Sequence, residues 1–313
     1  MNDEQLIEMI ASRVRARLMA GGEGPGYTRS HGAEHPSTTQ AYSVPTRTNS
    51  VGAADEDCDD CGMCDVPVSE SAANMLRAGA DRVGAHGGVG ASAGNLAAYI
   101  DHTLLKPEAT REQLRALADE ARKHKFATVC VNSVNVRLMS QFLRGSDVPV
   151  CAVVGFPLGA MSPRSKAYET KEAIRCGAQE IDMVINIGAV KSTDYELVYR
   201  DIVAVVEAAK PIGVKVILET SKLSHDEKVV VCALSKAAGA AFVKTSTGFG
   251  GGGATEEDVR LMRTLVGGDM GVKASGGIRS REDADKMISA GANRLGASAS
   301  VAIVTGGKSN SDY

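Results

Sequence analysis

The sequence contains little that would direct it into a membrane or an oxidising compartment. Its 313 residues include no tryptophan and only 4% aromatic residues. No apolar run approaches the ~20 residues that a membrane span needs, and no signal-peptide-like segment opens the chain. The seven cysteines are odd in number and scattered, unlike a disulfide framework. We therefore expect a cytoplasmic protein with reduced thiols, in which Cys130, Cys151, Cys176 and Cys232 act as small hydrophobic residues.

An excess of basic residues is also missing. Lysine and arginine number 35 against 38 aspartates and glutamates, which gives a formal net charge of −3. This balance gives the chain no general attraction to nucleic acids or to anionic membrane surfaces. We expect neither as a partner.

The first 94 residues differ in composition from the remainder. Residues 1–20 carry apolar side chains at helical spacing, Ile10 and Val14 among them, and predict an amphipathic helix. Residues 21–94 are rich in glycine, serine, proline and charge, and they cannot bury enough apolar area to offset the entropy of ordering. We predict a flexible linker there.

A cysteine cluster lies within this linker. Cys58, Cys61 and Cys64 follow C-x2-C-x2-C spacing, which suits an iron–sulfur cluster or zinc if a distant fourth ligand completes the set. The ferredoxin-like fourth cysteine followed by proline is missing. A redox-labile or merely compositional cluster is the alternative, and the sequence leaves both open.

Residues 95–305 alternate between short apolar or β-branched runs and amphipathic helical stretches such as residues 111–124 and 281–291. This alternation predicts a parallel sheet, and eight units in this length favour a closed (β/α)8 TIM barrel over an open doubly wound sheet. No G-x-G-x-x-G follows the first run, which weakens the open-sheet alternative. The eight runs are residues 97–103, 127–132, 150–157, 180–188, 214–220, 241–248, 271–277 and 293–300.

Three charged residues are expected inside this barrel. Strand alternation places Asp182, Lys244 and Lys273 on inward faces, near the strand ends where barrel active sites form. A structural salt bridge is one explanation, but two lysines against one aspartate would leave an ammonium unpaired. The other is a Schiff-base lysine, because burial and a neighbouring positive charge favour the neutral, nucleophilic amine. Lys215, on the fifth run, is expected either to support the site or to point outward.

Glycines suggest an anion site beside the lysines. Gly276 and Gly277 end the seventh run, and Gly296 and Ser298 end the eighth. Barrels commonly bind phosphate at these two strand ends, where backbone N–H groups can approach the anion. We expect a phosphorylated substrate.

Several motifs together resemble the deoxyribose-phosphate aldolase family. They occur in order across residues 95–305: IDHTLLKP, VCVN, VVGFPLGA, IDMVINIG, VKTSTGFG, VKASGGIR and LGAS. The resemblance implies a homodimeric class I aldolase that needs no cofactor or metal. It also implies reversible cleavage of 2-deoxy-D-ribose 5-phosphate to acetaldehyde and D-glyceraldehyde 3-phosphate.

The resemblance also implies residue roles. Lys244 would form the Schiff base, with Lys273 as the neighbour that keeps it neutral. Asp182 would donate and accept protons, and Asp101 would contribute a first-strand carboxylate. Another Schiff-base sugar-phosphate aldolase and a catalytically lapsed phosphate-binding barrel remain alternatives.

Both ends of the chain carry further expectations. Tyr313 ends a polar tail, residues 306–313, which is either disordered or, as in some aldolases of this family, reaches the site to help protonate the enamine carbon. Residues 1–20 could pack on the barrel itself or dock to another protein. With their linker they resemble encapsulation peptides that load enzymes into bacterial microcompartments through a shell protein.

Overall fold

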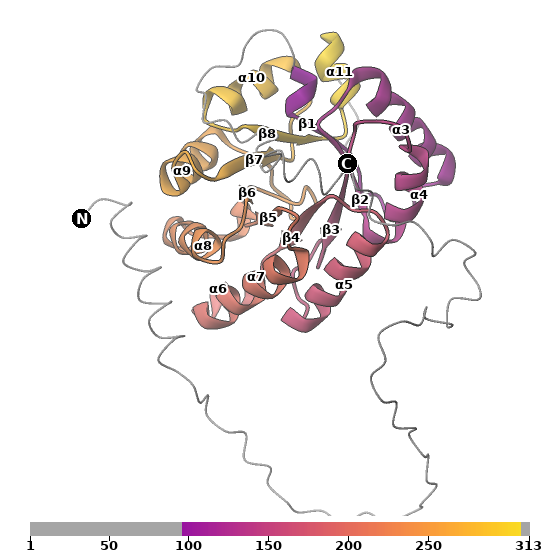
Figure 1. Ribbon diagram of the computed structural model, residues 1–313. Coiled ribbons are helices and arrows are strands. Elements are labelled where there is room, and N and C mark those ends of the chain that lie inside the picture. Colours follow the sequence, from indigo (N-terminus) through magenta and orange to yellow (C-terminus); the bar gives the residue numbers. More distant parts are fainter. Residues whose placement is uncertain (1–95, 308–313) are drawn as a thin grey trace, which may run out of the picture.

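The computed structural model describes residues 96–307, and these form one closed β/α barrel (Figure 1). Its strands are parallel and neighbour one another in chain order, with β8 pairing back to β1. The predicted TIM barrel is thereby confirmed for this part of the chain. The strands are β1 (Ile100–Leu104), β2 (Thr128–Asn132), β3 (Val150–Val154), β4 (Glu180–Val184), β5 (Val214–Ile217), β6 (Phe242–Lys244), β7 (Gly271–Ser275) and β8 (Arg294–Ala297).

Helices surround the strands in chain order, as Figure 1 shows. The α-helices are α3 (Arg111–His124), α4 (Val136–Phe142), α5 (Pro163–Arg175), α6 (Ile187–Lys191), α7 (Tyr195–Ala209), α8 (His225–Ala237), α9 (Glu256–Val266), α10 (Arg281–Ser289) and α11 (Ser300–Thr305). Short 3-10 turns occur at η2 (Leu96–Tyr99), η3 (Ser133–Asn135) and η4 (Thr220–Lys222).

Local capping explains where several helices begin. Thr110 and Gln113 form a reciprocal capping box at the start of α3, because each side chain accepts a hydrogen bond from the other's backbone N–H. Asn186 caps α6 by accepting from Ala189 N at 3.0 Å. β4 ends at Val184, before this cap, so the fourth apolar run is longer than the strand it contains.

Buried side chains occupy two separate regions, one between the strands and the helices and one inside the ring of strands. The main apolar core lies between the strands and the surrounding helices, as expected for a sheet whose outer face is covered. A small apolar cluster made by Leu105, Cys130, Cys151 and Val153 lies inside the barrel. Charged side chains from β4, β5, β6 and β7 meet in the same interior.

Other expectations fall outside the described residues. These are the helix at 1–20, the linker at 21–94 with its cysteine cluster, and Tyr313 with most of its tail. Within residues 96–307, no helix is both long enough and apolar enough to span a bilayer.

Candidate active site

Asp182 is the centre of the charged cluster inside the barrel. Its Oδ1 accepts from Lys215 Nζ at 2.8 Å. Its Oδ2 accepts from Lys244 Nζ at 2.8 Å and from Lys273 Nζ at 2.7 Å. These four residues come from the adjacent strands β4, β5, β6 and β7, and all are buried. The structure therefore brings together the aspartate and both lysines that strand alternation placed inside.

A second carboxylate adjoins this centre. Asp101, on β1, pairs with Lys273 Nζ and accepts from Arg294 Nη1 at 2.8 Å. Lys273 consequently bridges two buried aspartates, one at the first strand and one at the fourth. Asp101 thus lies in the polar network, as the resemblance implied.

Lys215 points into the barrel, so the outward alternative is wrong. Its Nζ lies 2.5 Å from Glu180 Oε2 in addition to its bond to Asp182. Arg294 Nη1 lies 3.1 Å from the same Glu180 oxygen. Through these side-chain contacts, Glu180 links β4 to β5 and to β8.

The charges of the cluster do not balance when every group is ionised. Its cationic side chains are those of Lys215, Lys244, Lys273 and Arg294, and its carboxylates are those of Asp101, Asp182 and Glu180. A buried excess of positive charge is costly. One neutral amine would make the cluster electrically neutral.

The pKa shifts indicate which groups keep their charge. Burial alone would raise the pKa of Asp182, but Lys215, Lys244 and Lys273 outweigh it and hold the pKa well below its usual range. Burial would lower the pKa of Lys273, yet Asp101 and Asp182 raise it. The pKa of Lys215 is likewise raised, chiefly by Asp182 against the effect of burial. Lys215 and Lys273 are therefore ammonium groups at neutral pH.

Lys244 is held less tightly than the other two lysines. It contacts one carboxylate, Asp182, whereas Lys215 and Lys273 each contact two. It is the last residue of β6, at the end of the barrel where active sites form, and 3% of it is exposed. Lys244 therefore differs from the other two lysines in having a single carboxylate partner.

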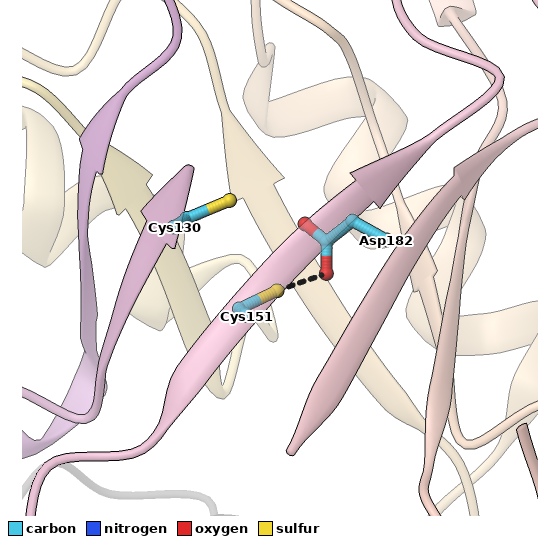
Figure 2. Close-up of side chains that lie close together, drawn as sticks. All are labelled: Cys130, Cys151 and Asp182. Carbon is cyan, nitrogen blue, oxygen red and sulfur yellow. Dashed lines mark hydrogen bonds between the residues drawn. The ribbon is translucent and has the colours of Figure 1, made fainter. Parts of the chain in front are cut away.

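Cys130, Cys151 and Asp182 form the one potential metal-ligand group found among the described residues, with ligand atoms within 4.8 Å of one another (Figure 2). Cys151 Sγ donates to Asp182 Oδ1 at 3.1 Å, and Lys215 Nζ lies 3.5 Å from that sulfur. Burial, with Cys130 and Asp182 adding to it, raises the pKa of the Cys151 thiol well above its usual value. A protonated thiol and a carboxylate already bonded to three lysines make a poor cation site.

The sequence suggested purely apolar surroundings for Cys130 and Cys151, and the structure differs from this expectation. Cys130 and Cys151 are partners on β2 and β3 and lie in the small apolar cluster inside the barrel. Cys151 nevertheless contacts Asp182 and Lys215. Cys232, by contrast, is buried in the apolar core.

The glycines expected to bind phosphate follow β7 and β8. Gly276 and Gly277 have φ angles of 85° and 78°, a left-handed conformation that favours glycine. The two consecutive residues leave no side chain between the turn and an approaching anion. Gly296 lies within β8, where a Cβ would come 2.5 Å from Ser275 Oγ, and Ser298 follows, half-buried. Whether these residues bind phosphate stays a prediction.

Sequence reasoning missed part of the cluster. Glu180 and Arg294 were not identified, although each stands two residues before an expected inward residue, Asp182 and Gly296. The period of two along a strand was the signal that could have found them. Glu219 was also missed, although the fifth apolar run contains it; β5 ends at Ile217, so this run is longer than its strand.

Comparison with known proteins gives a consistent match. The family model described as DeoC/LacD family aldolase matches residues 95–307. A deoxyribose-phosphate aldolase of Macrococcus caseolyticus is 59% identical over 219 residues, 70% of this chain and 100% of that protein. One from Streptococcus gordonii is 60% identical over 69% of this chain and 98% of its own length. The tetrameric deoxyribose phosphate aldolase of Aeropyrum pernix has a TM-score of 0.64 and 37% identity, covering 67% of this chain and 89% of that one.

Proposed function

The chain belongs to the DeoC/LacD family of aldolases, and we propose on that basis that it acts as a deoxyribose-phosphate aldolase through a Schiff base on Lys244. The reaction is the reversible cleavage of 2-deoxy-D-ribose 5-phosphate to acetaldehyde and D-glyceraldehyde 3-phosphate. Aldolases that use a lysine in this way need no cofactor, because the iminium accepts the electron pair.

The first half of the reaction uses the neutral amine of Lys244. It adds to the C1 aldehyde of the open-chain sugar, and loss of water gives an iminium. The C3 hydroxyl then loses its proton to Asp182, directly or through a water molecule. The C2–C3 bond breaks, its electrons pass to the iminium to give an enamine, and D-glyceraldehyde 3-phosphate leaves.

The second half returns the enzyme to its starting state. A proton is added to the terminal enamine carbon, and hydrolysis of the resulting imine releases acetaldehyde and frees Lys244. Tyr313 is the proposed donor at that carbon. The low pKa of Asp182 means that this carboxylate holds a proton only in transit between substrate and water.

One observation carries the choice of Lys244. It shares Asp182 Oδ2 with Lys273, but only Lys273 has a second aspartate to retain its proton. A neutral Lys244 also removes the excess positive charge of the buried cluster. Lys273 keeps its positive charge through its pair with Asp101, and this charge is what makes a neutral Lys244 favourable. Gly276, Gly277, Gly296 and Ser298 are proposed to hold the substrate's phosphate through backbone N–H groups and a hydroxyl.

The test is borohydride reduction of the protein in the presence of acetaldehyde, followed by peptide mass analysis. One irreversible ethyl adduct on Lys244 is expected. Absence of any adduct would favour the lapsed phosphate-binding barrel. An adduct together with faster cleavage of a different sugar phosphate than of 2-deoxy-D-ribose 5-phosphate would favour another Schiff-base aldolase.

The remaining proposals concern the rest of the chain and its assembly. Residues 1–20 are proposed to dock the enzyme to a microcompartment shell protein through the linker at 21–94, because confinement would retain volatile acetaldehyde. A homodimer is proposed from the family resemblance. Cys58, Cys61 and Cys64 keep a ligand-like spacing, and metal analysis of protein purified without oxygen would test iron or zinc there.

A further inference from the structure

A glycine-rich segment leads away from the site and is unusual in composition. Residues 247–253, here called the glycine loop, read TGFGGGG and begin three positions after Lys244. They connect β6 to α9 at the same end of the barrel as the lysine. A segment with four consecutive glycines has little conformational preference of its own, so neighbouring groups must hold it in place.

Glu219 is one such neighbour. It follows β5, only 2% of it is exposed, and its backbone has φ 57° and ψ 64°. A non-glycine residue in this left-handed region is strained and persists only where its surroundings hold it. Burial of a carboxylate adds a further cost unless its oxygens are bonded.

The carboxylate of Glu219 is directed at the glycine loop. Its Oε2 accepts from Thr247 N at 3.2 Å and also from Thr247 Oγ1. Thr247 Oγ1 in turn accepts from Phe249 N at 3.0 Å. Within residues 96–307, the carboxylate bonds to Thr247 alone, and Oε1 has no partner. Its position therefore serves this loop and not the lysine cluster.

The loop also packs directly on the carboxylate. A Cβ at Gly250 would lie 2.5 Å from Glu219 Cδ and 2.8 Å from each of its oxygens. No residue larger than glycine fits there unless Glu219 moves. The bonds to Thr247 and the contact with Gly250 together hold the first half of the loop.

The far end of the loop packs on the turn that follows β7. Ala254 N donates to Gly276 O at 3.0 Å, and a Cβ at Gly253 would come 2.5 Å from that oxygen. Gly276 and Gly277 are the residues proposed to bind phosphate. The glycine loop thus lies between Glu219 and this turn.

We propose that Glu219 is a positioning residue that holds the glycine loop against Gly276 and thereby shapes the site for the substrate's phosphate. This inference rests on the proposed function, since it concerns the same anion site. Glu219 itself touches neither the substrate nor Lys244. Its effect is on recognition of the phosphate, not on formation of the Schiff base.

The test compares a phosphorylated with an unphosphorylated substrate. Glu219→Gly relieves the backbone strain but removes the carboxylate, so it is expected to fold and to raise KM for 2-deoxy-D-ribose 5-phosphate about tenfold. Cleavage of unphosphorylated 2-deoxy-D-ribose and borohydride labelling of Lys244 by acetaldehyde should be unchanged. Glu219→Gln keeps an acceptor for Thr247 and should restore most of the affinity. Equal losses on both substrates, or no loss on either, would overturn the inference.

Variants of the loop provide an independent arm. Gly250→Ala should raise the same KM by a similar factor, and this effect should shrink in the Glu219→Gly background, because the carboxyl group that the new methyl would strike is gone. Gly268→Ala is the matched control, since a Cβ there meets nothing within 4 Å. Lys125→Gly is the control for relief of a positive φ, because Lys125, the residue that follows α3, has φ 54°. Purely additive effects would contradict the proposed contact.

Binding of inorganic phosphate, measured by calorimetry, separates this inference from the proposed function. The dissociation constant should rise about tenfold in Glu219→Gly and in Gly250→Ala. A parent protein that binds phosphate with this dependence but cleaves no deoxyribose 5-phosphate would overturn the proposed function alone. Unchanged phosphate binding in both variants, or none in the parent protein, would overturn the role of Glu219.

Discussion

Lys244 and Lys273 occupy paired positions on the adjacent strands β6 and β7, and both ammonium groups bond to the same oxygen of Asp182. Two like charges on one acceptor disfavour each other, so the arrangement favours loss of one proton. Lys273 keeps its proton because Asp101 provides a second carboxylate. The pairing therefore distinguishes Lys244, the proposed nucleophile, from Lys273, although both are buried lysines.

Replacing Lys244 with methionine should abolish turnover and leave the fold intact. Methionine fills a similar volume and cannot form an imine, so we expect kcat to fall at least about a thousandfold. Circular dichroism and borohydride labelling check the fold and the missing adduct. Lys171→Met, on the exposed surface of α5, should behave as the parent protein. Activity within about tenfold of the parent value would exclude Lys244 as the nucleophile.

Replacing Lys273 with leucine should change the pH dependence of catalysis. Without this cation, the cluster holds three cations and three carboxylates, so charge neutrality no longer favours a neutral Lys244. Activity at neutral pH should fall on the order of a hundredfold and recover in part toward alkaline pH. The profile of kcat/KM against pH measures this. A loss that is constant with pH would indicate direct substrate contact instead.

Replacing Asp182 with asparagine should destabilise the barrel. Three lysines lose their shared carboxylate, and removing one partner of a buried ion pair costs about 3–5 kcal/mol. Urea unfolding at neutral pH gives the free energy of unfolding. Asp226→Asn, at an exposed position in α8, is the control and should change that free energy little.

The dependence of the unfolding free energy on acid pH should report on the carboxylate of Asp182. The pKa of Asp182 in the folded protein is lowered well below its unfolded value of about 3.9. Its contribution is therefore fully present above that value and is lost as pH falls through the lower, folded pKa. The unfolding free energy of the parent protein should decline below about pH 4, and Asp182→Asn should show a shallower decline over that range. Equal slopes in both proteins would contradict the ion-paired state of Asp182.

Deletion of Tyr313 should slow proton exchange at the methyl group of acetaldehyde more than it weakens sugar-phosphate binding. The reason is that its proposed role is to protonate the enamine carbon, a step after carbon–carbon cleavage. Exchange in deuterated water, followed by NMR, measures this rate. An unchanged exchange rate would remove Tyr313 from the mechanism.

Residues 1–20 fused to a fluorescent protein should recruit it to co-expressed microcompartment shells. Ile10→Glu with Val14→Glu places charges on the apolar face and should abolish recruitment. Fluorescence microscopy distinguishes the two fusions. Diffuse fluorescence from the unmutated fusion would argue against shell docking and would not affect the aldolase assignment.

The sequence by itself determined the barrel and three residues of its interior. Eight apolar runs separated by helical stretches predict a closed parallel sheet. All eight strands lie at those runs, and only β1 ends one residue beyond its run. The period of two along each strand then placed Asp182, Lys244 and Lys273 inside. These are local properties, so neighbouring residues along the chain were enough to reveal them.

Only the tertiary structure decided how the charges pair. Lys215 lies on a four-residue strand whose apolar neighbours fit either face, and its direction depends on the register of β5 against β4. The distance of Lys244 from a second carboxylate depends on strands that are far apart in sequence. Glu219 meets the glycine loop 28 positions later because both segments leave the barrel at the same end. Such contacts join side chains from segments that are far apart in the sequence, and no local pattern encodes which of them meet.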